Sequence, residues 1–141
     1  MANLDDTEEK ITVYDIKTGL MTAEITKDIE NTSNLMMHGE YFYTYDANKL
    51  SVYKMPSASS DLASCLIASY ETSAEITCFS VIDNSLYLAT KSGVYVLDIS
   101  SVSSGILRFI TTIAENTDIT ALCINGNNLY VAKKTNNQIS V

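Results

Sequence analysis

The sequence has no tryptophan, and only one proline, five glycines and one histidine among its 141 residues. The few scattered glycines exclude phosphate-binding loops, since neither a GxGxxG motif nor a P-loop is present. A single histidine, His38, leaves little material for nucleophilic catalysis, because the nucleophile needs a base beside it. His38 precedes Gly39 in a predicted turn, so we interpret it as a solvent-exposed turn residue.

Carboxylates offer the remaining route to catalysis, since two acids that meet in a channel can cleave a glycosidic bond. Asp15, Glu75 and Asp98 are the acids that come closest to this role. The sequence contains no calcium-loop pattern of alternating acids. We therefore predict a non-catalytic protein without catalytic, cofactor-binding or metal-binding residues.

Cysteine is also scarce. Cys65, Cys78 and Cys123 are odd in number and far apart, which does not fit a disulfide-rich secreted module. A zinc site made of these thiols and His38 is the alternative, but the spacing matches no common zinc finger. We expect reduced thiols that fill small gaps in the core.

Basic residues are few, with 9 against 17 acids, a net charge of −8 and a single arginine. Nucleic-acid binding and anionic membranes both require clustered positive charge, so we expect neither partner. The acids Asp5, Asp6, Glu8 and Glu9 predict a flexible acidic tail over residues 1–10. No signal-peptide pattern or long apolar run is present, which favours a cytoplasmic location, with the nucleus as the alternative.

Apolar residues make up 46% of the chain and charged residues 18%, which is typical of one folded domain rather than a disordered segment. Self-similarity decides its organisation. Segments rich in Val, Ile, Tyr and Thr recur, and Val13, Val52, Val96 and Val141 mark one motif at spacings of 39, 44 and 45 residues.

The recurring segments predict units of three clear β-strands separated by short polar turns, followed by a less distinct fourth strand. First strands are predicted at 33–37, 76–81 and 119–124, second strands at 41–44, 86–89 and 129–132, third strands at 11–16, 50–55, 94–99 and 139–141, and fourth strands at 66–70 and 106–113. Asp83-Asn84 and Asn125-Gly126 suit tight hairpins. A helix over residues 20–30 is the competing interpretation of Met21, Ile25 and Ile29.

The third strand at 94–97 is apolar throughout, which indicates sheets that are covered on both faces. Small four-stranded sheets that stack around an axis form a β-propeller. Tyr41, Tyr43, Tyr87 and Tyr130 lie inside predicted strands, and we assign them to packing rather than to ligand binding.

The repeat length and the motifs resemble the WD40 family. Residues 10–19 look like the end of a WD40 repeat, residues 75–98 resemble a nearly whole one, and Tyr14-Asp15 and Leu97-Asp98 stand in the place of its Trp-Asp pair. The resemblance implies a WD40-like β-propeller over residues 11–141, with Asp15 and Asp98 as structural strand-end residues. It also implies a protein–protein interaction platform. A small-ligand or glycan site at the propeller axis, or an enzyme built on it, is the alternative.

The strand count gives about three blades, fewer than the four to eight at which propellers close. We therefore expect either a fragment of a larger propeller or a self-assembling part of one. The serine-rich stretches 57–64 and 100–104 both connect a third to a fourth strand, so they project from one rim. They form either a binding face or flexible loops without a function.

Overall fold

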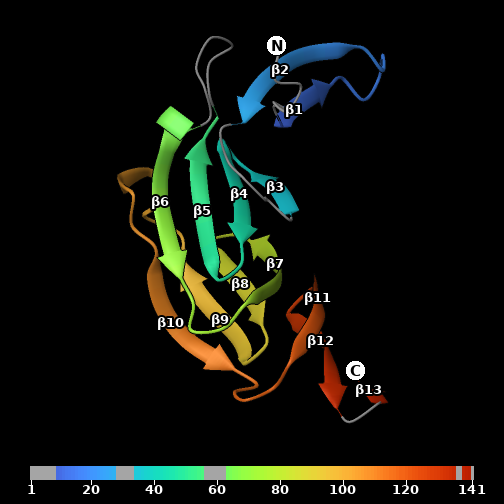
Figure 1. The fold of residues 1–141 in the computed structure, drawn as a ribbon, viewed down its shortest axis with the longest axis vertical. Coiled ribbons are helices and arrows are strands. Elements are labelled where there is room, and N and C mark those ends of the chain that lie inside the picture. Colours follow the sequence, from blue (N-terminus) through green and yellow to red (C-terminus); the bar gives the residue numbers. More distant parts are fainter. Residues whose placement is uncertain (1–8, 28–33, 56–62, 136–137, 141) are drawn as a thin grey trace, which may run out of the picture.

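A computed structural model describes residues 9–27, 34–55, 63–135 and 138–140. Within them every regular element is a β-strand, apart from two single-turn 3-10 helices, η1 (Ala63–Cys65) and η2 (Val102–Ser104). The predicted all-β class is confirmed. The strands form four antiparallel sheets, in each of which strands adjacent in sequence pair with one another (Figure 1).

Two four-stranded sheets lie between two smaller ones. The first sheet contains β1 (Glu9–Tyr14) and β2 (Met21–Lys27). The second contains β3 (Asn34–His38), β4 (Tyr41–Asp46), β5 (Lys49–Lys54) and β6 (Leu66–Glu71). The third contains β7 (Ile76–Ile82), β8 (Ser85–Thr90), β9 (Gly93–Asp98) and β10 (Arg108–Ile113). The fourth contains β11 (Ile119–Asn125), β12 (Asn128–Thr135) and β13 (Gln138–Ser140).

Every strand predicted from the repeats is present, with ends displaced by a few residues. The stretch weighed as a helix is the strand β2 over residues 21–27, because cross-strand pairing with β1 outweighs its local helical spacing. β1 begins at Glu9, so Glu9 and Lys10 belong to a strand and not to the predicted tail. Residues 1–8 and 28–33 lie outside the described residues.

The third sheet is covered on both faces, as its apolar β9 predicts. Leu86, Leu88 and Leu97 are buried against the second sheet, where they meet Tyr43 and Leu50. Its opposite face is buried against the fourth sheet through Ala89, Val94 and Ile119. Alternate residues of a strand point to opposite faces, so an unbroken apolar run is what a sheet between two neighbours requires.

Thr77 joins three sheets at a β-bulge. The pairing of β7 with β8 shifts between Ile76 and Cys78, which leaves Thr77 out of the ladder. Its carbonyl oxygen accepts a hydrogen bond from the Tyr45 hydroxyl at 2.7 Å, and its own hydroxyl donates to the Ile119 carbonyl at 2.6 Å. The bulge therefore supplies polar groups to both neighbouring sheets.

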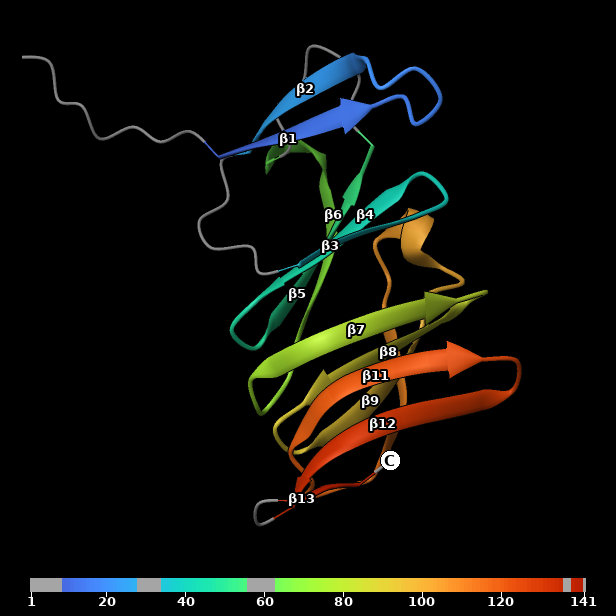
Figure 2. The ribbon, with the colours of Figure 1, turned by 90° about the vertical axis from the view of Figure 1, so that its right-hand side faces the viewer.

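The four sheets stack in chain order, from the β1–β2 hairpin at one end to β11–β13 at the other (Figure 2). β7 and β11 lie side by side, while β10 forms an exposed outer edge with Phe109 and Ile110 about half exposed. The part of the chain that the structure describes contains no helix long and apolar enough to cross a membrane.

Candidate functional site: a pocket between two sheets

A pocket of about 310 Å³ opens at one end of the seam between the second and third sheets. We call it the rim pocket. Two hairpin turns and one longer connection build it: the β3–β4 turn, the β7–β8 turn and the chain between β9 and β10. Its lining residues are His38, Gly39, Tyr41, Tyr43, Asp83, Asn84, Ile99, Ser100, Val102 and Ser103.

The chain between β9 and β10 is anchored in the core, which corrects the expectation of a flexible loop for stretch 100–104. Val102 is buried in the core between the two sheets, and the η2 turn around it ends at Gly105, whose φ of 75° is left-handed. A Cβ on Gly105 would lie 2.7 Å from the Ile67 carbonyl oxygen of β6. The segment is therefore a folded wall of the pocket and not a flexible loop. The other stretch lies mostly outside the described residues, in 56–62.

Asp98 holds the start of this wall. One of its carboxylate oxygens accepts a hydrogen bond from the Ser100 backbone N–H at 2.8 Å. This bond, the Ser100 side chain and the charge of Arg108 hold the pKa of Asp98 below its usual value. After β1, a carboxylate oxygen of Asp15 likewise accepts hydrogen bonds from the backbone N–H groups of Lys17 and Thr18. Both acids are thus strand-end residues, the role that the resemblance implied.

His38 contacts the neighbouring sheet, which corrects its interpretation as a simple exposed turn residue. Its Nε2 lies 2.9 Å from the carbonyl oxygen of Asp83 in the β7–β8 turn. Since a carbonyl only accepts, Nε2 carries the proton and the ring is the donor. The half-buried ring therefore bridges the two hairpins that form the pocket.

Tyr43 is the unusual residue of the pocket. Its side chain is fully buried, and its hydroxyl has no hydrogen-bond partner among the described residues. Burial, with a smaller effect of Tyr41, raises the pKa of Tyr43 to about 12, so the phenol stays protonated at neutral pH. Most buried hydroxyl groups are paired, because an unpaired one costs its full desolvation energy. Tyr43 therefore places an unpaired hydroxyl group, closed to solvent, among the residues that line the pocket.

Replacing Tyr43 with phenylalanine is expected to stabilise the fold by about 1 kcal/mol, because the change removes an unpaired buried hydroxyl and keeps the ring. The matched control is Tyr45→Phe, which loses the bond to the Thr77 carbonyl and is expected to cost about 1 kcal/mol. Urea unfolding of both variants measures the two changes. Equal losses of stability would mean that the Tyr43 hydroxyl is bonded in solution.

The remaining residues singled out in the sequence are dispersed. Cys65 and Cys78 are half-buried and Cys123 is exposed, so the core-filling role does not hold for Cys123. The described residues contain no cluster of three or more His, Cys, Asp or Glu that could hold a metal ion. Tyr130 is also exposed, at 43%, although packing was expected for it.

No protein-family model and no curated protein matches the sequence. The rim pocket is therefore defined by geometry alone. The sequence placed Tyr43 in a strand and assigned it to packing rather than to ligand binding. The unpaired hydroxyl could not be predicted, because it depends on residues far away in the chain. One signal was present in the sequence, because stretch 100–104, which forms a wall of the pocket, was one of the two stretches considered as a binding face.

Proposed function

We propose that the chain is a non-catalytic protein-interaction module, built from WD40-like β-propeller blades, that binds partner proteins at the rim pocket. The observation that carries this proposal is the buried Tyr43 hydroxyl without a partner beside a pocket made by turns. Binding residues occur often on loops that a rigid scaffold holds in place. The meander order of the sheets and their stacking support propeller-type blades.

The chemistry of the pocket suits an extended peptide segment. Tyr43 can donate to a peptide carbonyl, while Asn84, Ser100 and Ser103 add further polar groups at the opening. The lining contains a carboxylate, Asp83, and the chain has a net charge of −8. Opposite charges steer association, so a partner segment with lysine or arginine is favoured.

A small polar ligand such as a glycan is the second candidate, at this rim rather than at an axis. The volume of about 310 Å³ is within the range of small-molecule pockets, and a tyrosine pair with several hydroxyl and amide groups lines it. A bound peptide and a bound glycan would contact the same groups of the pocket. The same variants therefore test both candidates against a pocket that binds no ligand.

Selection of displayed random peptides, and a parallel glycan array, test the proposal with the full chain. Peptides selected on the wild type are expected to bind Tyr43→Phe about tenfold more weakly, because a few central contacts supply most of the binding energy. Tyr45→Phe serves as the control, because its hydroxyl is already bonded to Thr77. Chemical-shift changes at Asn84, Ser100 and Ser103 should locate the bound peptide.

Glycans that bind with the same dependence on Tyr43 would favour the second candidate. If neither screen gives a ligand that is sensitive to Tyr43→Phe, the rim pocket is not a binding site. Ligands whose shifts map to another face would overturn the assignment in the same way.

A further inference from the structure

The outer face of β11 and β12 is apolar and exposed, at the opposite end of the stack from β1. Four side chains, which pair across the two strands, form it: Ala121, Cys123, Tyr130 and Ala132. They alternate with Leu122 and Val131, which pack against the third sheet. Tyr130 is 43% exposed, and the face is hollowed by about 220 Å³.

The same positions are covered in the third sheet. The β7–β8 and β11–β12 hairpins each have a two-residue turn at one end and the same β-bulge at the other, so their residues can be matched one to one. The matched residues in the third sheet are Cys78, Ser80, Tyr87 and Ala89. Of these, Cys78, Tyr87 and Ala89 pack against the fourth sheet. The outer face of β11–β12 thus repeats a face that receives another sheet.

A surface that would fit the outer face of β11–β12 is present on the same chain. In the fourth sheet, Leu122 and Ile124 lie opposite Val131 and Leu129, on the side that faces the third sheet. The matching residues of β3 are Leu35 and Met37, which lie opposite Thr44 and Phe42. Leu35 and Met37 are 42% and 48% exposed, on the side of β3 away from the third sheet.

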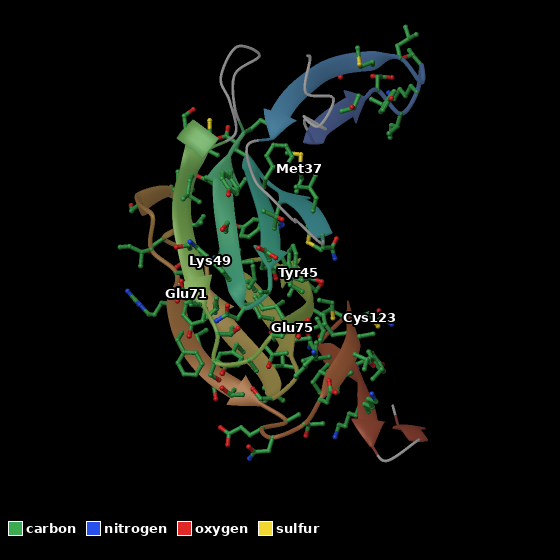
Figure 3. All side chains as sticks on the ribbon, in the orientation of Figure 1. Met37, Tyr45, Lys49, Glu71, Glu75 and Cys123 are labelled. Carbon is green, nitrogen blue, oxygen red and sulfur yellow. The ribbon has the colours of Figure 1, made fainter. Side chains whose placement is uncertain are left out.

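These two surfaces cannot meet within one copy. Met37 lies on the second sheet and Cys123 on the last one, with the third sheet between them (Figure 3). Closure within one copy would join the first and fourth sheets into one blade, and the resulting three blades are fewer than the four at which propellers close. We propose that the outer face of β11–β12 binds the Leu35 and Met37 surface of a second copy, and that the reciprocal contact closes a dimer.

Open strand edges point to the same occupant. Within the described residues, β1 pairs with β2 alone, and β12 pairs with β13 only through residues 133–135. In the third sheet, residues 85–89 of β8 match residues 128–132 of β12, and they pair with residues 94–98 of β9. The repeat aligns Val96 with Val13. Residues 94–98 of β9 therefore correspond to residues 11–15, which lie in and just after β1.

The β1–β2 hairpin of one copy therefore completes the β11–β12 hairpin of the other. Each copy contributes two complete four-stranded sheets, and the junctions add two composite ones. The resulting ring lies within the range of closed propellers. Unpaired edges and an exposed apolar face, both of which favour uncontrolled association, are covered in one step.

Analytical ultracentrifugation of the full chain over a wide concentration range tests the dimer. The wild type is expected to sediment with twice the mass of one chain. Met37→Glu and Tyr130→Lys are each expected to sediment as monomers, because each places an unpaired charge in an apolar junction. The double variant is expected to dimerise again, since each junction then holds one acid and one base. Ile110→Glu, on the exposed edge strand β10, is the control and should remain dimeric.

Alkylation of Cys123 gives a second measurement that requires no variant. The thiol is exposed in one copy, so its rate of alkylation should fall as the chain concentration rises. Peptide mapping separates it from Cys65 and Cys78. A wild type that is monomeric throughout, a dimer that survives both single substitutions, or a concentration-independent rate at Cys123 would each overturn the proposal.

Discussion

Leu88→Ala is expected to lower the free energy of unfolding by about 3 kcal/mol, the range found when a fully buried leucine is truncated. Leu88 is fully buried in β8, where it packs in the core between the second and third sheets. The loss combines the removed apolar surface with the cavity that remains. Urea unfolding monitored by circular dichroism measures it.

Leu66→Ala is the matched control, because the same truncation occurs at a β6 residue that is 46% exposed. It is expected to change the free energy of unfolding by less than about 0.5 kcal/mol, as exposed substitutions usually do. If the two variants lose the same stability, the two sheets are not packed face to face as described.

Gly105→Ala is expected to cost about 3 kcal/mol, because backbone strain and a steric clash act together. The left-handed backbone at Gly105 disfavours a side chain, and the new Cβ would meet the Ile67 carbonyl oxygen at 2.7 Å. That oxygen belongs to the backbone of β6, so it cannot turn away. The η2 wall of the rim pocket would then shift away from β6.

Gly126→Ala separates strain from clash. Gly126 has a similar φ of 58°, but no atom lies within 4 Å of an added Cβ. This substitution is expected to cost only about 1 kcal/mol, the strain of a left-handed residue. Thermal unfolding compares the two alanine variants. Equal losses would show that the contact between η2 and β6 is loose.

The secondary structure was largely predictable because it follows from local pattern. Repeated runs of Val, Ile and Tyr located the strands, and Asp83-Asn84 and Asn125-Gly126 located the turns of the β7–β8 and β11–β12 hairpins. The apolar run at 94–97 correctly indicated a sheet covered on both faces. The stretch 20–30 was ambiguous, because its apolar spacing fits a helix and only pairing with β1 makes residues 21–27 a strand.

The sequence by itself therefore determined the all-β class, the order of the strands and the positions of the turns, which depend on residues close together in the chain. Only the tertiary structure decided which groups meet: the Tyr43 hydroxyl left unpaired, the His38 ring against Asp83, and Val102 in the core. It also decided that Tyr130 and Cys123 are exposed although their repeat partners are covered or half-buried. Equivalent sequence positions differ in this way because burial depends on the neighbouring sheet, and the sequence of a strand does not specify its neighbour.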